Sequence, residues 1–140
     1  MPVAPFRLDF EVRDYECDLA GVVNNAVYQN YLEHARNTYV KTLGIDYPAW
    51  VKRGIALVII RAEIDYLAPL RSGDRFYATV NVARLSPLRI GFQQDLFRLP
   101  DERPVLRARF VGTAINAQGR PQLPKELAEL IAHALAAAKG

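Results

Sequence analysis

The sequence predicts an α+β domain in which an antiparallel sheet curls around one long helix. One segment of the 140-residue chain repeats its apolar residues every three or four positions, which is typical of an amphipathic helix. One strand-like run precedes this segment and four follow it, with alternating polar and apolar residues and short turns. Such a sheet has one face to cover, and the helix carries the apolar stripe to cover it.

A loop separates the first predicted strand from the helix. Residues 6–15 alternate between apolar and polar side chains, as a half-buried strand does. The alternation stops over residues 16–25, which we interpret as a loop. The helix follows over residues 26–43, and Asn24 and Asn25 are favourable N-cap residues in front of it. Its apolar stripe comprises Tyr28, Tyr31, Leu32, Ala35, Tyr39, Val40 and Leu43.

Four strand-like runs and a second helix make up the rest of the chain. Gly44 suits a left-handed stop after the first helix, and a connector with Pro48 and Gly54 follows. The turn signal Ser-Gly-Asp at residues 72–74 and two later turns favour an antiparallel meander of the four strands. An amphipathic helix is predicted from Pro124 onward. The four runs cover residues 55–67, 76–82, 90–99 and 105–115.

Length and composition indicate one domain over residues 1–140. Hydrophobic residues make up 51% and charged residues 24%, the balance of a soluble globular protein. A chain of this length buries about 68–70% of its unfolded surface and needs no metal or disulfide to hold its core. The single cysteine, Cys17, cannot form an intrachain disulfide. No apolar stretch approaches the ~20 residues of a membrane span, and residues 1–8 hold no signal-peptide core, so we expect a cytoplasmic protein.

Arginine dominates the positive charge of the chain. The net charge is +3, with 14 Arg against 4 Lys. The planar guanidinium binds phosphate and carboxylate groups through two parallel hydrogen bonds. The basic residues are spread along the chain and no zinc-finger or RNP-type motif is present, so nucleic acid is not an expected partner. A mild excess of this kind fits an acidic carrier protein or a phosphorylated cofactor as ligand.

The loop before the helix holds the residues best suited to chemistry. Asp18 lies seven residues before Asn25, and Gly21 between them permits a tight backbone path. The start of a helix has N–H groups without internal partners and is partly positive, so it can stabilise an oxyanion. One such donor contributes roughly 2.7–4 kcal/mol in acyl-transfer sites. A carboxylate and such a donor, side by side, are the minimum set of groups needed to hydrolyse an activated acyl group.

This segment resembles the signature of the hotdog-fold thioesterases. The resemblance is carried by residues 18–28, with the sequence DLAGVVNNAVY, and by Tyr31, Glu33, Ala35 and Arg36. It is similar above all to the 4-hydroxybenzoyl-CoA thioesterase family and to plant acyl-lipid thioesterases and their bacterial relatives. The resemblance implies a five-stranded antiparallel sheet wrapped around the long helix. It also implies subunits that pair edge to edge as dimers, which often associate into tetramers.

Two loop residues acquire roles from this resemblance. Asp18 matches the catalytic aspartate of the family, which is either a nucleophile that forms an acyl-enzyme anhydride or a general base that acts on water. Asn25 matches the helix-start position whose backbone N–H polarises the thioester carbonyl. Some relatives carry a tyrosine or histidine near Asn24 and Asn25, so the asparagines here leave open any side-chain contribution.

Each of these residues also has a structural interpretation. Asp18 is otherwise a solvated loop acid, and Asn24 and Asn25 are otherwise only helix caps. Glu33 lies on the helix, where another branch of the fold keeps its catalytic carboxylate. A solvated acid, or one that faces Arg36, is the simpler interpretation of Glu33.

The residues predicted to bind the substrate are arginines and residues in or near the loop. Coenzyme A carries three phosphates, which arginines at strand ends or in loops would bind. For the apolar and aromatic candidates, packing in the core is the alternative interpretation. The candidate substrate-binding residues are Gly21, Val22, Tyr28, Arg53, Arg84 and Arg89.

The resemblance therefore implies an acyl-CoA thioesterase that assembles as a homodimer or homotetramer, and we expect neither a metal nor another cofactor. An acyl-ACP thioesterase and a non-catalytic acyl-CoA-binding module are the alternatives. A dehydratase is less favoured, because that chemistry needs a histidine beside a carboxylate and neither His34 nor His133 lies in such a motif. Aromatic, short and long acyl groups remain equally compatible with the sequence.

Overall fold

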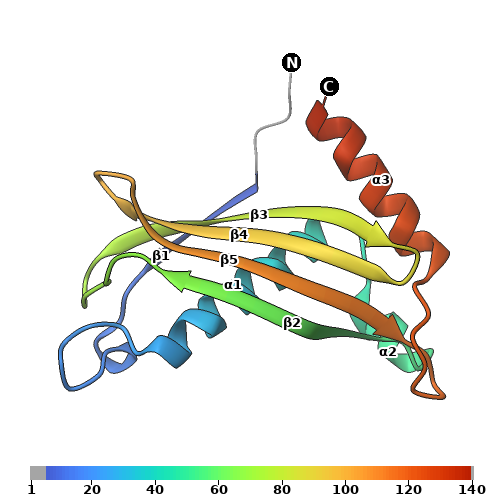
Figure 1. Ribbon diagram of the computed structural model, residues 1–140, viewed down its shortest axis with the longest axis horizontal. Coiled ribbons are helices and arrows are strands. Elements are labelled where there is room, and N and C mark those ends of the chain that lie inside the picture. The colour runs from blue at the N-terminus through green and yellow to red at the C-terminus, as the bar shows by residue number, and fades with distance from the viewer. Residues whose placement is uncertain (1–5, 140) are drawn as a thin grey trace.

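Five strands form a single antiparallel sheet in the order β1-β3-β4-β5-β2 (Figure 1). The computed structural model describes residues 6–139. Within these residues, no helix is both long and apolar enough to cross a bilayer. The arrangement confirms the predicted α+β hotdog fold. The elements are β1 (Phe6–Glu11), α1 (Asn25–Thr42), α2 (Tyr47–Lys52), β2 (Ala56–Tyr66), β3 (Arg75–Ser86), β4 (Arg89–Leu99), β5 (Arg103–Ile115) and α3 (Lys125–Lys139).

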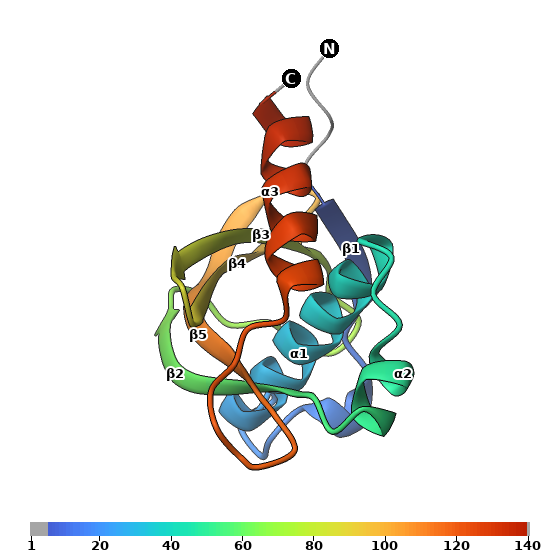
Figure 2. The ribbon, with the colours of Figure 1, turned by 90° about the vertical axis from the view of Figure 1, so that its right-hand side faces the viewer.

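The sheet curls around α1, which packs along its concave face (Figure 2). The predicted apolar stripe faces the sheet, and its first four residues are each at most 5% exposed. Phe76 of β3 is fully buried, stacks on Phe10 with ring centroids 4.9 Å apart, and lies at the same distance from the Tyr31 ring. Buried aromatic rings contribute large apolar areas to a core. These contacts fix the direction of α1 and hence the position of its first residue.

The first strand is shorter than predicted. β1 ends at Glu11, and Asp14–Glu16 form a turn of 3-10 helix. Glu11 already lies opposite the first residue of β3, so β3 offers no partner to the residues that follow. The Val12 N–H donates instead to the Asp74 carbonyl at 2.9 Å, in the linker before β3. An alternating pattern cannot reveal this exit, because side chains alternate in any extended segment.

The connector after α1 contains a helix that the sequence pattern does not predict. The carboxylate of Asp46 accepts a hydrogen bond from the Ala49 N–H at 3.1 Å and so caps α2. Pro48 lies in the first turn, where its missing N–H is harmless. Trp50 is buried. Six residues are too few to show the repeat of apolar residues that indicates a helix, so the sequence pattern does not predict α2.

β2 pairs with β5 and not with β3. The predicted meander is therefore correct for β3, β4 and β5 and wrong for β2. The linker over residues 67–74 is not a hairpin turn, because it leaves β2 and crosses to the other side of the sheet. The N–H groups of Leu67 and Ala68 both donate to the Val105 carbonyl, and Leu70 is fully buried.

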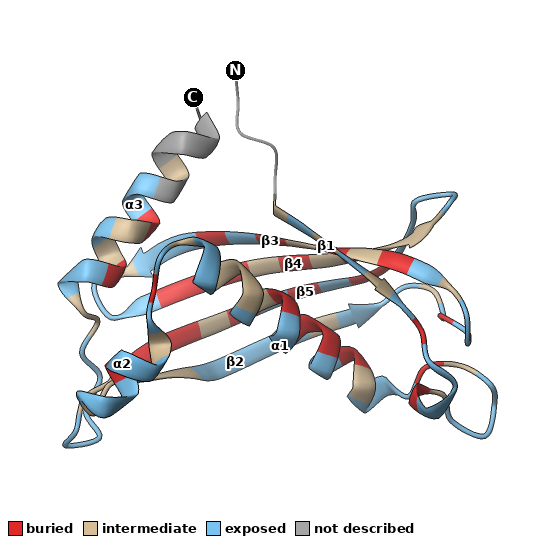
Figure 3. Cartoon of the chain, turned by 180° about the vertical axis from the view of Figure 1, so that it is seen from behind, coloured by how far each residue is buried: buried red, intermediate tan, exposed pale blue. Residues whose placement is uncertain are grey.

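β2 lies at an edge of the sheet and is its most exposed strand (Figure 3). A bulge between Ile59 and Arg61 leaves Ile60 50% exposed, and Tyr66 at the end of the strand is 49% exposed. An edge strand has a row of unpaired N–H and C=O groups. Together with exposed apolar side chains, these groups make β2 a surface suited to pairing with another strand.

Replacing Phe76 by alanine should lower the free energy of unfolding by about 3–5 kcal/mol, because it removes a fully buried ring from between Phe10 and Tyr31. Denaturant-induced unfolding followed by circular dichroism measures this loss. The control is Leu19→Ala, whose side chain is fully exposed and which should change stability by no more than about 0.5 kcal/mol. Equal effects of the two substitutions would contradict the packing described here.

Candidate active site

Asp18 lies in a tight hairpin between the 3-10 turn and α1. Cys17 and Val23 form an isolated antiparallel bridge at its base, and the Asp18 N–H donates to the Val22 carbonyl at 2.9 Å. The Gly21 N–H donates back to the Asp18 carbonyl at 3.0 Å. Gly21 has φ of 80°, a conformation that favours glycine, so the tight path predicted there is observed.

The Asp18 carboxylate is exposed but held in place. Its Oδ1 accepts a hydrogen bond from the Ala20 N–H at 2.8 Å, which closes an Asx-type turn. Leu19 at the tip of the hairpin is fully exposed. The acid and this leucine therefore both face solvent.

Asn24 and Asn25 have different tasks at the start of α1. Asn24 is the N-cap, and its Oδ1 accepts a hydrogen bond from the Ala26 N–H at 2.9 Å. Its own N–H donates to the Glu16 carbonyl at 3.0 Å, which joins the base of the hairpin to the helix. Asn25 is the first residue of α1, and within residues 6–139 its N–H has no hydrogen-bond acceptor. An unpaired amide at the positive end of an 18-residue helix is the donor that an oxyanion needs.

The start of α1 lies against the C-terminal end of β2. The Tyr66 hydroxyl donates to the Asn25 carbonyl at 3.3 Å. The Tyr66 ring also meets the Tyr28 ring edge-on, with centroids 5.6 Å apart. The candidate oxyanion donor is therefore next to the exposed edge of the sheet.

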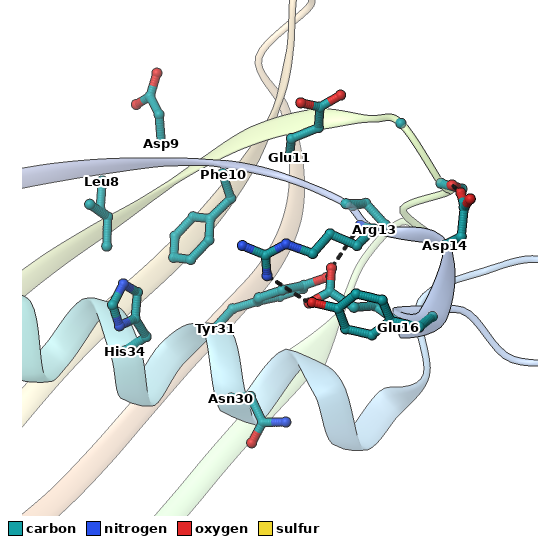
Figure 4. A pocket seen from close by; sticks show the side chains of 14 residues that line it. Leu8, Asp9, Phe10, Glu11, Arg13, Asp14, Glu16, Asn30, Tyr31 and His34 are labelled. Carbon is teal, nitrogen blue, oxygen red and sulfur yellow. Dashed lines mark hydrogen bonds and ion pairs between the residues drawn. The ribbon is translucent and has the colours of Figure 1, made fainter.

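Glu16 is a buried carboxylate that sequence patterns do not reveal. It is 8% exposed, and its Oε1 accepts hydrogen bonds from the Tyr31 hydroxyl and the Arg13 N–H, each at 2.8 Å (Figure 4). The Arg13 guanidinium lies 3.6 Å from Oε2. Burial, and then the hydrogen bond to Glu16, raise the pKa of Tyr31, so its hydroxyl stays a donor. The only sequence signal is an acid two residues before Asp18, in a segment without periodicity.

A depression of about 910 Å³ lies beside this carboxylate, on the β1 side of α1 (Figure 4). Its walls come from β1, the 3-10 turn and the middle of α1, and they include Phe10, Asn30 and His34. Asp18 is not among the lining residues. The depression and the Asp18 hairpin are therefore separate features of the chain.

Val22 and Tyr28 are engaged in packing. Val22 forms an isolated bridge with Arg71. Tyr28 is buried, and its hydroxyl oxygen accepts a hydrogen bond from the Leu70 N–H at 3.1 Å, which holds the linker before β3 against α1. Burial raises the pKa of Tyr28. A substrate contact for either residue stays a prediction.

The three candidate arginines lie at the end of the sheet opposite to the Asp18 hairpin (Figure 1). Arg53 caps α2 and forms an ion pair with Glu126 of α3 at 3.2 Å. The Arg84 guanidinium donates to two carbonyls of the β3–β4 turn, each at 3.3 Å. Arg89 is exposed at the start of β4.

The strand register gives the distance between the arginine-bearing end of the sheet and the end next to the start of α1. Tyr66, next to the start of α1, pairs with Leu106, which pairs with Leu96. Arg84 pairs with Ile90 on the same strand as Leu96. The steps from Leu96 to Ile90 span about 20 Å at 3.4 Å per residue. The fold of the chain therefore does not bring the arginines to Asp18.

The acid and the arginine of the α1 motif have separate environments. Glu33 is exposed, which fits its interpretation as a solvated acid. Arg36 donates to Gln94 Oε1 at 2.9 Å, and its guanidinium lies 4.6 Å from the centre of the Phe110 ring. Burial lowers the pKa of Arg36. Arg36 thus belongs to the packed interior between α1 and the sheet.

Comparison with known proteins identifies the family of this chain. Residues 12–132 match the model of the thioesterase-like superfamily. The chain belongs to this superfamily. A chloroplastic acyl-acyl carrier protein thioesterase of Arabidopsis thaliana is 39% identical over 91% of this chain and 68% of its own length. A 1,4-dihydroxy-2-naphthoyl-CoA hydrolase of Rippkaea orientalis is 30% identical over 81% of this chain and 83% of its own length.

A solved structure shares the fold. The 1,4-dihydroxy-2-naphthoyl-CoA thioesterase from Synechocystis superposes with a TM-score of 0.85 and 20% identity, over 92% of this chain and 96% of its own. This chain therefore shares its fold with that protein. At the level of the family, this chain is a thioester hydrolase.

Proposed function

We propose that this chain hydrolyses an acyl-CoA to the free acid and CoA, with Asp18 as the catalytic carboxylate and the Asn25 amide as the oxyanion donor. The proposal is carried by the Asn25 N–H at the start of α1, which has no hydrogen-bond acceptor in the described part of the chain. The hydrogen bond between Asn24 and Glu16 joins this amide to the hairpin that holds Asp18. A carboxylate and a preorganised N–H donor are what acyl transfer requires.

The chemistry follows from these two groups. The thioester carbonyl oxygen accepts a hydrogen bond from the Asn25 N–H, and the helix dipole favours the negative charge that develops there. As a general base, Asp18 takes a proton from water while the water oxygen adds to the carbonyl carbon; the C–S bond then breaks and the thiolate of CoA takes up a proton. As a nucleophile, Asp18 adds directly and displaces the thiolate, and water hydrolyses the resulting anhydride.

A second copy of the chain completes the site in this proposal. β2 is an edge strand with exposed apolar side chains, and Tyr66 at its end touches the start of α1. Antiparallel pairing of two β2 strands about their middle places the Tyr66 end of one against the Ala56 end of the other. The Asp18 hairpin of one subunit then lies near the end of the sheet that bears the partner subunit's Arg53. We therefore propose a homodimer, or a tetramer of two such dimers.

We propose that the phosphates of CoA bind at the end of the partner subunit's sheet that carries the three candidate arginines. Arg89 is the best candidate, because Arg53 is paired with Glu126 and Arg84 with carbonyls of its own turn. Arg89 also lines a surface depression of about 650 Å³ together with Ile60 and Leu85. A cationic group beside exposed apolar side chains suits a ligand with a phosphate end and an apolar arm.

A second candidate carrier is an acyl carrier protein. Two chloroplastic acyl-acyl carrier protein thioesterases of Arabidopsis thaliana are 39% and 36% identical to this chain, over 91% and 92% of it. The carrier protein is acidic, and the net charge of +3 on this chain is complementary to it. The acid–amide chemistry is the same for either carrier.

Asp18→Asn should lower kcat for acyl-CoA hydrolysis by about 10²–10⁴-fold, because the amide can neither accept the proton nor attack the carbonyl. Asparagine retains the oxygen that accepts from the Ala20 N–H, so the hairpin should keep its shape. Thiol release over a panel of acyl chain lengths measures kcat. Glu33→Gln is the matched control and should leave kcat unchanged. Full turnover by Asp18→Asn would remove Asp18 from the mechanism, and binding without turnover by the unmodified chain would indicate an acyl-CoA-binding module.

Asn25→Pro should reduce kcat by about 10²–10³-fold, because it deletes the N–H that donates to the oxyanion. Proline is tolerated at the first position of a helix, and Asn24 already has the extended backbone that precedes a proline comfortably. Asn25→Ala keeps the amide and should retain activity. Thermal unfolding checks that both variants fold. Equal activity of the two variants would rule out the amide as the donor.

Arg89→Ala should raise KM for an acyl-CoA by roughly fivefold, equivalent to about 1 kcal/mol for one exposed contact with phosphate. The same acyl group is assayed on CoA and on an acyl carrier protein. Arg120→Ala, at an exposed arginine beyond β5, is the control. A rise in KM confined to the carrier-protein substrate would favour the acyl carrier protein as the carrier. No rise in KM with either carrier would exclude Arg89 as the residue that binds phosphate.

A further inference from the structure

Glu16 connects the Asp18 hairpin to α1 at two separate points. Its backbone carbonyl accepts from the N–H of Asn24, the N-cap residue. Its carboxylate accepts from the Tyr31 hydroxyl, at 2.8 Å. Asn24 and Tyr31 are seven residues apart, about two helical turns, and so lie on the same face of the helix. One residue is thus held at two places along α1, just before the chain turns into the hairpin.

Tyr31 is a rigid anchor for this connection. It is 4% exposed, and its ring is packed against Phe10, Phe76 and Tyr28 at centroid distances of 5.4, 4.9 and 6.1 Å. The position of its hydroxyl is therefore set by the core and not by the loop. Because the core holds this donor in place, its hydrogen bond also holds the accepting residue in place relative to the core.

We propose that Glu16 is a positioning residue, whose carboxylate, held by the Tyr31 hydroxyl, sets the place of Asp18 relative to the Asn25 amide. This inference rests on the proposed function, in which Asp18 and that amide act on the same carbonyl. Only Cys17 separates Glu16 from Asp18, and the Cys17–Val23 bridge passes any displacement of Glu16 into the hairpin. Displacements of about 1 Å at a catalytic group can cost 10²-fold in rate.

The Arg13 amide keeps the carboxylate in one orientation. The Arg13 N–H donates to the same Oε1 as the Tyr31 hydroxyl, and the guanidinium lies on the other side, near Oε2 (Figure 4). Glu16 therefore has partners from the segment before the hairpin and from α1. The network spans the junction where strand β1 gives way to the catalytic loop.

Tyr31→Phe tests the role most directly, because the ring stays in the core and only the hydroxyl is lost. We expect kcat for thioester hydrolysis to fall by about ten- to a hundredfold, with KM changed by less than about twofold. The matched control is Tyr39→Phe on the same helix. Tyr39 packs its ring on Phe6, and within residues 6–139 its hydroxyl has no hydrogen-bond partner. Tyr39→Phe should leave kcat unchanged.

Variants at Glu16 supply a second, independent readout. Glu16→Gln retains an oxygen that can accept both hydrogen bonds and should recover most of the activity lost in Glu16→Ala. The double variant Glu16→Ala/Tyr31→Phe should lose no more kcat than Glu16→Ala alone, because the two groups act through one contact. Thermal unfolding of each variant separates loss of fold from loss of rate.

Three outcomes would overturn the proposal: a kcat for Tyr31→Phe equal to that of Tyr39→Phe, losses in the double variant that add, or a loss that disappears when the variant is assayed far below its Tm. Asp18→Asn is assayed alongside. Activity lost in Asp18→Asn and retained in Tyr31→Phe defeats the positioning role alone. Activity retained in Asp18→Asn defeats the proposed function, whatever Tyr31→Phe shows.

Discussion

The packing of α1 into the curled sheet is the contact on which the rest of the structure depends. The helix buries one apolar stripe, so only one rotation about its axis satisfies the core. With that rotation set, α1 begins beside the C-terminal end of β2, where Tyr66 meets Asn25. The helix itself has no acceptor for its first amide, and none of residues 6–139 supplies one. Core packing thus decides where a positive, hydrogen-bonding helix end is presented.

The same packing leaves β2 incompletely covered. The helix lies under the middle of the sheet, and the outer edge of β2 has no strand beside it within the described residues. Ile60 in the middle of β2 and Tyr66 at its end are exposed there, and Tyr66 contacts the start of α1. A second strand paired with this edge would bury these apolar side chains. In the proposed homodimer, subunit association and completion of the site involve this same surface.

Polar groups inside the core position its elements. Within the described residues, each buried side-chain nitrogen or oxygen has a hydrogen-bond partner. Gln94 on β4 joins the Leu32 carbonyl to Arg36 on α1, which fixes the helix against the centre of the sheet. Glu16 does the same between α1 and the loop that precedes it. An unsatisfied buried polar group is costly, so such networks tolerate few alternative arrangements.

The sequence by itself determined the fold class, the extent of α1 and the loop that holds Asp18, because periodicity, N-cap chemistry and glycine placement are local properties of the chain. Tertiary structure alone decided that β2 lies beside β5, since strand order depends on which edges meet after the chain has crossed the sheet. It also decided that Asn24 caps α1, that the Asn25 N–H has no acceptor among the described residues, and that Glu16 is buried against Tyr31. Contacts between residues distant in sequence have no period and no local signature, so only the packed molecule reveals them.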